Sequence, residues 1–230
     1  MNYDYDFGII LVNSNNIIGD LVKLFINSPW NHICILFVGN YDEKKKVMEP
    51  TGNNLYVIES NWYLDFEGIK ITKFNKFVEN YNAREMRVRI LKNENIENKK
   101  EKKEIFAKTL NEILEKDIGY EKNINEFQKA IKGNPLPREY DNFSGFICSE
   151  FVAYMFREIG MLPKSISATG YFPTHFDDDN ELESIKKFKS KSKKLLKEKK
   201  ERERFLKNKF CILNYPYTFR TVKIIKKLNQ

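Results

Sequence analysis

The stretch SGFICSEFVAYMF, residues 144–156, places a cysteine at the start of an apolar pattern with the period of a helix. Gly160 is the expected cap of this helix, and Pro163 lies beyond it. The predicted apolar face consists of Phe151, Val152, Met155, Phe156 and Ile159. Cys148 is either a small core residue or a nucleophile, because free cysteines are usually buried, whereas a helix N-terminus favours the thiolate. Partner residues elsewhere in the chain must decide between the two.

Short β-branched runs precede this helix and predict four strands. They are FGIILV (7–12), HICILFV (32–38), LYVIES (55–60) and MRVRIL (86–91). Residues 99–119 then predict a helix that ends at Gly119, with Ile105, Phe106, Leu110, Ile113 and Leu114 on one face. FCILNY (210–215) and TVKIIKKL (221–228) predict one or two further strands, and the residues 40–54 and 132–146 are predicted to be loops because they are richest in turn residues. The first half of the chain is therefore expected to be mostly sheet.

The size and composition of the chain fit a single domain, residues 1–230, with a substantial core. Of its 230 residues, 41% are hydrophobic and 14% are aromatic. The three cysteines, Cys34, Cys148 and Cys211, are widely spaced, which fits neither a disulfide framework nor a zinc site. We therefore expect a reducing compartment, no metal ion and no other cofactor.

The sequence also predicts a soluble, intracellular protein. No stretch approaches the roughly 18 uninterrupted apolar residues of a membrane-spanning helix, and the start MNYDYDFG is acidic and polar, unlike a signal peptide. The abundance of Lys and Asn suggests an AT-rich genome, such as that of a large DNA virus or a parasite. The expected location is the cytoplasm, including that of a host cell.

The net charge of +8 is concentrated in one lysine-rich insertion. Residues 186–209 hold thirteen Lys or Arg and three Glu, so this segment carries +10 and the remainder carries −2. A solvated lysine-rich helix or a disordered insertion is the plainer interpretation. The alternative is a segment that contacts an anionic membrane surface or nucleic acid, and of these we favour the membrane.

A nucleophilic cysteine needs a histidine beside it, and the chain has only two. His32 begins an expected strand, where a rigid backbone can aim the ring across a cleft towards Cys148. His175 lies in GYFPTHFDDD, a segment without a regular pattern. We favour His32 as the general base, although a histidine at a strand edge is most often structural.

A third group should hold the imidazole in its useful tautomer, and Glu59 at the end of the next expected strand is the candidate. A solvent-facing strand end is an equal alternative for Glu59, and Asn61 or Asp65 would be next in line. Cys34 and Cys211, each flanked by apolar residues, are expected to be ordinary buried thiols.

The order of these motifs resembles the circularly permuted papain-like branch of the NlpC-type cysteine peptidase superfamily. The resemblance rests on GD at 19–20, a histidine that opens an apolar strand, VIE at 57–59 and, far downstream, CSEFV on a helix. It also takes in MRVRIL, IGYEKN (118–123) and YFPTHF (171–176), and so spans about residues 7–176. The charged stretch 93–104 and the insertion 186–209 have no counterpart in the pattern.

The resemblance implies an α+β fold, in which an antiparallel sheet or partial barrel packs against the helix that carries the cysteine. It implies a cysteine hydrolase or acyltransferase with nucleophile Cys148, base His32 and orienting residue Glu59. Such an enzyme cleaves an amide, ester or thioester through an acyl-enzyme, with the Cys148 N–H as one oxyanion donor. The sequence identifies no second donor.

The relatives implied by the resemblance include cell-wall amidases and the lecithin:retinol acyltransferase group. An intracellular protein does not suit peptidoglycan, so the expected substrate is a lipid, a lipid-modified protein or a peptide amide. The opposing hypothesis is a non-catalytic binding module that contacts membrane or nucleic acid through residues 186–209. The oligomeric state is left open.

Overall fold

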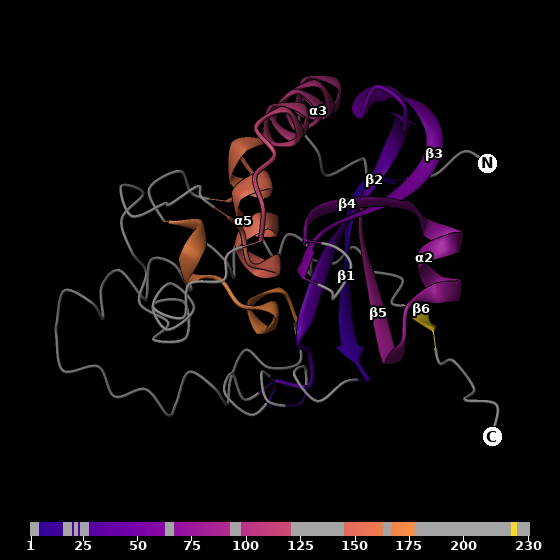
Figure 1. Cartoon of the computed structure of the whole chain (residues 1–230), viewed down its shortest axis with the longest axis vertical. Coiled ribbons are helices and arrows are strands. Elements are labelled where there is room, and N and C mark those ends of the chain that lie inside the picture. Colours follow the sequence, from indigo (N-terminus) through magenta and orange to yellow (C-terminus); the bar gives the residue numbers. More distant parts are fainter. Residues whose placement is uncertain are drawn as a thin grey trace, which may run out of the picture.

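The computed structural model describes residues 5–15, 20, 23, 28–62, 67–92, 98–120, 145–162, 167–177 and 222–224. Six strands lie among them (Figure 1): β1 (Tyr5–Ser14), β2 (His32–Asp42), β3 (Val47–Trp62), β4 (Glu67–Lys73), β5 (Ala83–Lys92) and β6 (Val222–Ile224). The α-helices are α2 (Phe74–Asn80), α3 (Lys99–Glu115) and α5 (Cys148–Glu158), and the short 3-10 turns are η3 (Ala168–Gly170) and η4 (Pro173–Phe176).

The strands form one antiparallel sheet in the order β4-β3-β2-β1-β5-β6. The described strands leave the sheet open rather than closed as a barrel, because the order ends at β4 on one side and at β6 on the other. The expectation of an α+β protein with an antiparallel sheet packed against the cysteine helix is confirmed, since α5 contacts β2 and β3.

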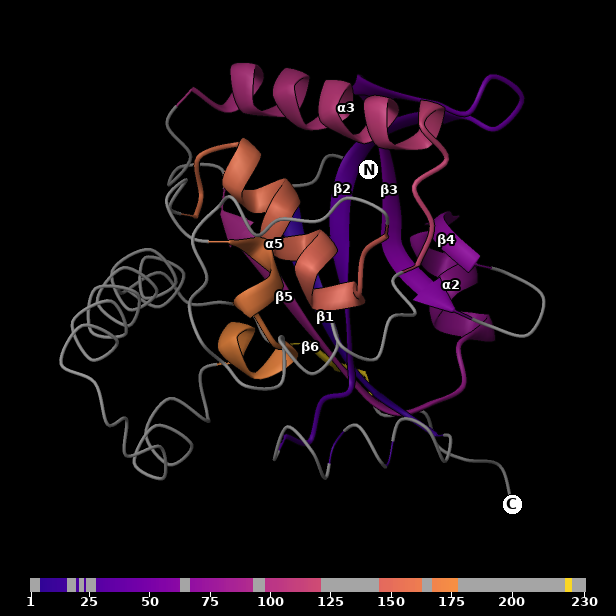
Figure 2. The ribbon, with the colours of Figure 1, turned by 60° about the vertical axis from the view of Figure 1, so that its left-hand side comes forward.

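Helices cover both faces of the sheet, and the alternation of its side chains explains why. In β1, Phe7, Ile9 and Leu11 belong to an apolar cluster with α3 and α5, whereas Ile10 and Val12 belong to a second cluster with Phe77 of α2. Successive side chains of a strand point to opposite faces of the sheet. A strand that is apolar at every position must therefore be covered by other elements on both faces. Figure 2 shows α3 and α5 in front of the central strands.

The four predicted strands and both predicted helices are present, with shifted ends. The predicted helix over 99–119 ends at Glu115, where Lys116 caps it before Asp117 takes a positive φ of 50°. The second helix begins at Cys148, as the sequence indicates. Gly160 adopts a φ of 71° and its N–H bonds the Arg157 carbonyl oxygen at 2.9 Å, which is the expected capping role.

The segment 40–54 is not the loop that its turn residues predict. β2 and β3 continue through it as a hairpin, with Asn40 opposite Glu49 and Gly39 opposite Asn54. The four residues between Glu49 and Asn54 bulge from the ladder, which accommodates Pro50 and a positive φ of 121° at Gly52. The prediction was wrong because a bulge tolerates residues that a regular strand excludes.

Other predictions differ from the structure or fall outside the described residues. β4 and α2 were not predicted, since EGIKITK and FNKFVEN are short and mostly polar. β6 covers three residues of the predicted strand 221–228. The lysine-rich insertion 186–209, the segment 210–215, Cys211, Asp65 and residues 132–144 lie outside the described part of the chain.

Candidate active site

His32 and Glu59 form a buried hydrogen-bonded pair on neighbouring strands. His32 opens β2, Glu59 lies in β3, and their side chains meet with 2.8 Å between Nε2 and Oε2. The exposed fractions of the two residues are 6% and 2%. Glu59 is therefore not a solvent-facing strand end, and β3 continues beyond it to Trp62.

Asn61 and Tyr81 hold this pair from two sides. The Asn61 amide nitrogen donates to Glu59 Oε2 at 2.9 Å and lies 3.5 Å from His32 Nε2. The Tyr81 ring stacks on the imidazole, with centroids 6.0 Å apart and planes 13° from parallel. The ring of His32 is thus fixed in its plane, with Nε2 committed to Glu59.

Cys148 is the first residue of α5, where helical N–H groups and the helix dipole favour negative charge. Two contacts fix this helix start. Ser60, next to Glu59 in β3, donates to the Phe146 carbonyl oxygen at 2.6 Å, and the Phe146 N–H bonds the Gly119 carbonyl oxygen at 3.1 Å. The segment before Cys148 is therefore tied to the strand that carries Glu59.

Cys148 lies close enough to His32 to influence the ring electrostatically. Burial lowers the pKa of His32, but the electrostatic influence of Tyr81, Cys34 and Cys148 outweighs burial and holds the pKa well above its usual 6.5. Because Glu59 occupies Nε2, Nδ1 is the ring nitrogen left for the thiol. The residues selected from the sequence are thus gathered in one place.

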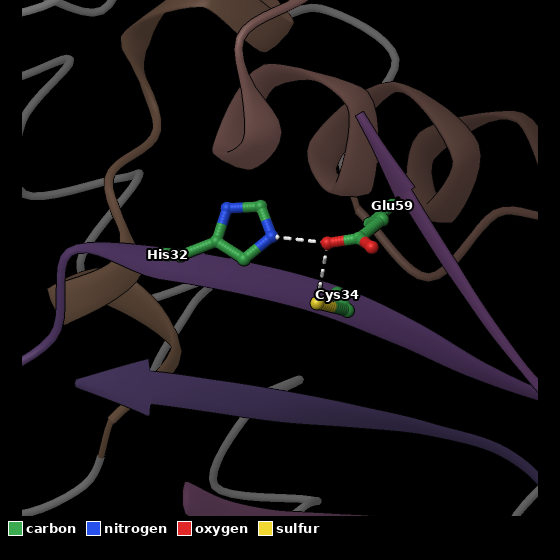
Figure 3. A group of neighbouring side chains, drawn as sticks. All are labelled: His32, Cys34 and Glu59. Atoms are coloured by element: carbon green, nitrogen blue, oxygen red, sulfur yellow. Dashed lines mark hydrogen bonds and ion pairs between the residues drawn. The ribbon is translucent and has the colours of Figure 1, made fainter. Parts of the chain in front are cut away.

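Cys34 also belongs to this site, although the sequence predicted that it would be an ordinary buried thiol. Its sulfur lies 3.8 Å from Glu59 Oε2, and Figure 3 shows His32, Cys34 and Glu59 turned towards one another. Burial raises the pKa of the Cys34 thiol to about 12. Cys34 therefore stays protonated at neutral pH and is no rival to Cys148 as a nucleophile. The sequence feature that could have placed Cys34 in the site is its two-residue spacing from His32, because this spacing puts both side chains on one face of β2.

Glu150, which is buried, and Tyr120, which is partly buried, are further groups near Cys148. Tyr120 interacts electrostatically with Cys148 and His32, and its pKa is raised, chiefly by burial, so the phenol keeps its proton. Glu150, in the first turn of α5, accepts a hydrogen bond of 2.5 Å from the Thr169 hydroxyl. Tyr120 lies in the IGYEKN stretch, whereas nothing in the sequence pointed to a partner for Glu150.

His175 has a structural role in η4. Its Nδ1 accepts a hydrogen bond of 2.9 Å from the Phe172 N–H, and its ring packs at the edge of Tyr171. The chain just after it is fastened to the sheet, because Asp177 accepts hydrogen bonds from Arg87 at 2.5 Å and from the Trp30 indole. The preference for His32 over His175 agrees with this geometry.

The site is nearly covered in this structure and is not the open cleft that the sequence predicted, because Cys148 is only 8% exposed. Asp20 of the GD motif lies at the surface and pairs with Arg84 at 2.8 Å.

A hollow of about 250 Å³ lies between β4 and the end of α3. It includes none of the proposed catalytic residues, and its lining includes Ile69, Ile71, Ile113, Leu114 and Ile118.

His32, Cys34 and Glu59 are also a set of residues that could hold a metal ion. One ligand atom from each lies within 4.8 Å of the other two, and all three residues are buried. The spacing of the cysteines predicted no metal ion, because a mixed set of ligands joined by strand pairing leaves no such pattern in the sequence.

Comparisons with known proteins add no relative. No protein-family model matches the chain, and no curated protein matches it. Among the described helices, none has the length and apolar character needed to cross a membrane.

Proposed function

We propose that the protein is a thiol hydrolase or acyltransferase in which Cys148 attacks a carbonyl carbon, His32 moves the proton and Glu59 orients His32. The observation that carries the proposal is the buried 2.8 Å bond between His32 Nε2 and Glu59 Oε2, on a ring that also interacts electrostatically with Cys148. A nucleophile, a base and an orienting acid linked in this order are the arrangement of a catalytic triad.

The reaction begins with the Cys148 proton on His32 Nδ1, a thiolate–imidazolium pair that the raised pKa of His32 favours. The thiolate adds to the carbonyl carbon of an amide, ester or thioester, and the imidazolium is stabilised by the Glu59 carboxylate. Collapse of the tetrahedral adduct expels the amine, alcohol or thiol, which takes the proton from His32. Water or an acceptor hydroxyl then gives its proton to His32 and attacks the acyl-enzyme, and Cys148 leaves as the thiol.

The negative oxygen of the tetrahedral adduct needs hydrogen-bond donors. The Cys148 N–H lies in the first turn of α5, where backbone N–H groups have no partner within the helix. The Tyr120 phenol is the proposed second donor, since it keeps its proton and lies within electrostatic range of Cys148. These two donors would stabilise charge that is present only in the adduct.

The proposed fold family is the permuted papain-like group, and the open antiparallel sheet with α5 packed on β2 and β3 supports it. The proposed substrates are lipids, lipid-modified proteins or peptide amides. We expect the acyl group of the substrate to be apolar. The site is buried among apolar residues, and an apolar group loses little favourable hydration when it leaves water for such surroundings.

Acylation of the intact protein tests the proposal. The protein is incubated with p-nitrophenyl esters of short and long acyl chains and with acyl thioesters, and peptide mass spectrometry locates the adduct. We expect the acyl group on Cys148, and we expect His32→Ala to abolish it while the matched variant His175→Ala retains it. An adduct confined to Cys34 or Cys211, or equal acylation in His32→Ala, would refute the proposal.

A further inference from the structure

We propose that His32, Cys34 and Glu59 form a binding site for Zn²⁺, and that filling this site switches off the Cys148 thiol. The first half stands on the geometry of the three residues. The second half rests on the proposed function, because it concerns the base that the reaction needs.

The positions of the three ligand atoms suit a zinc ion after a small adjustment. A tetrahedral zinc ion holds a nitrogen and an oxygen ligand about 3.3 Å apart and a sulfur and an oxygen ligand about 3.6 Å apart. The corresponding separations here are 2.8 Å from His32 Nε2 to Glu59 Oε2 and 3.8 Å from Cys34 Sγ to the same oxygen. The third pair, His32 Nε2 and Cys34 Sγ, lies within 4.8 Å, whereas a tetrahedral zinc ion holds a nitrogen and a sulfur ligand about 3.6 Å apart. Side-chain shifts of about half an ångström to one ångström therefore convert the hydrogen-bonded group into a ligand set.

The backbone holds the ligands in place. Cys34 and His32 lie two residues apart in β2, and Glu59 lies in β3, one position beyond the register pair Ile35 and Ile58. Both strands are interior to the sheet, with β1 and β4 on their outer sides. Figure 3 shows the three side chains converging from these two strands. Ligands on paired strands need little ordering when a metal binds, which favours affinity.

The chemistry of the donors selects zinc among common divalent ions. An imidazole, a thiolate and a carboxylate are all zinc ligands, whereas Mg²⁺ and Ca²⁺ take oxygen ligands. The charges also match, since a Cys34 thiolate, a Glu59 carboxylate and a neutral His32 ring sum to −2. The filled site would therefore bury no net charge, which matters because an unbalanced buried charge is costly. The fourth position is left to water, as at other three-ligand zinc sites.

Zinc and the proposed catalysis exclude each other because they use the same ring. In the proposed reaction His32 keeps a proton on Nε2 towards Glu59 and uses the Nδ1 lone pair to accept the proton of Cys148. Zinc on Nε2 moves that proton to Nδ1 and releases the thiol proton of Cys34 to solvent. The lone pair that would accept the Cys148 proton is then lost, so the nucleophile is not activated.

Zinc binding is measured on the full chain by competition with a chromogenic chelator, and Co²⁺ is used as a probe because a bound thiolate gives a near-ultraviolet charge-transfer band. We expect one ion per chain in the intact protein, with the band. Cys34→Ser and Cys34→Ala should lose the bound ion and the band, and Cys148→Ser should retain the ion and the band. Thermal unfolding checks that each variant is folded. Two Cys34 variants are used so that misfolding of one does not prevent the test.

Each outcome bears on the site. No stoichiometric zinc in the intact chain, or zinc retained in both Cys34 variants, would overturn it. Loss of the ion in Cys148→Ser would assign it to Cys148 and His32 Nδ1 instead, and would also overturn it. These measurements involve no substrate, so they stand even if the proposed reaction fails.

The switch is tested by acylation of Cys148 with and without zinc, each variant being compared with its own zinc-free rate. Zinc should strongly reduce acylation in the intact chain, and this loss should be absent in Cys34→Ala. Equal inhibition of both proteins would overturn the switch while leaving the proposed function intact. Absence of acylation in zinc-free protein would instead count against the proposed function.

Discussion

Ser60 donates a hydrogen bond of 2.6 Å to the carbonyl oxygen of Phe146, and these residues are 86 positions apart in the chain. Ser60 follows Glu59 in β3, and Phe146 lies two residues before Cys148. One buried bond thus joins the strand that carries the proposed orienting acid to the start of the helix that carries the proposed nucleophile. The distance between the two halves of the site depends on it.

Replacing Ser60 by Ala should therefore affect activity as well as stability. Loss of the hydrogen bond leaves a buried carbonyl oxygen without this donor, which costs about 1–3 kcal/mol in the free energy of unfolding. Acylation of Cys148 should fall even where the variant remains folded, because the helix start is less well positioned. Urea unfolding and acyl-enzyme mass spectrometry measure the two effects. Thr51→Ala, which removes a hydroxyl at an exposed position of the same strand, is the control and should change neither.

Glu59→Gln should keep the fold and lose turnover by about 10³–10⁴-fold, because an amide can still bond the ring but cannot stabilise the imidazolium. The loss should appear in kcat. Glu49→Gln makes the same change at an exposed position of β3, where Glu49 accepts a hydrogen bond from Asn40, and should leave turnover unchanged. Full turnover in Glu59→Gln would reassign the orienting role to Asn61.

Cys148 should be alkylated in preference to Cys34 at pH 8. A pKa of about 12 leaves about one Cys34 thiol in 10⁴ ionised at that pH, and the thiolate is the reactive form. The measurement is iodoacetamide labelling in a Cys211→Ser background, followed by peptide mass spectrometry. The expected result is one label per chain, on the Cys148 peptide. Faster labelling of Cys34 would contradict the assignment of the nucleophile.

The raised pKa of His32 predicts how stability depends on pH. A folded-state pKa above the unfolded value means that protonation stabilises the fold, so the contribution is complete below about pH 6.5 and is lost as pH rises through the folded pKa. Urea unfolding in chelator-treated buffer from pH 6 to pH 9 should therefore show a stability difference between the intact chain and His32→Gln that shrinks with rising pH. A difference that grows with pH would show that the folded pKa is lowered.

Residues 186–209 should give the protein a salt-sensitive affinity for anionic lipid. Lysines near an anionic membrane contribute on the order of 1 kcal/mol each before salt screening. Sedimentation with anionic and neutral liposomes, beside a nucleic-acid shift assay, compares the intact chain with a variant whose lysines in 186–200 are neutralised. Selective loss of binding to anionic liposomes is expected. If the two proteins bind the liposomes and the nucleic acid equally, residues 186–209 have no binding role and are only exposed to solvent.

Several features of the fold follow from sequence alone, because they depend on local periodicity. The strands of β1, β2 and β5, the apolar face of α3 and the start of α5 at Cys148 were all predicted by residue spacing and by capping residues such as Gly160. The choice of His32 over His175 also came from sequence, since only His32 begins a regular strand. The bulge in β3 escaped prediction because ladder pairing overrides the turn preference of Pro50 and Gly52.

The composition of the site was decided by the tertiary structure. Sequence reasoning proposed Cys148, His32 and Glu59, but it could not show that Glu59 is buried and bonded to Nε2, because strand register depends on contacts between residues distant in sequence. It placed Cys34 in the core, whereas pairing of β2 with β3 sets that thiol beside the Glu59 carboxylate. Residue spacing along one strand reveals which side chains share a face, and only the packing of other strands and helices on that face determines what they meet.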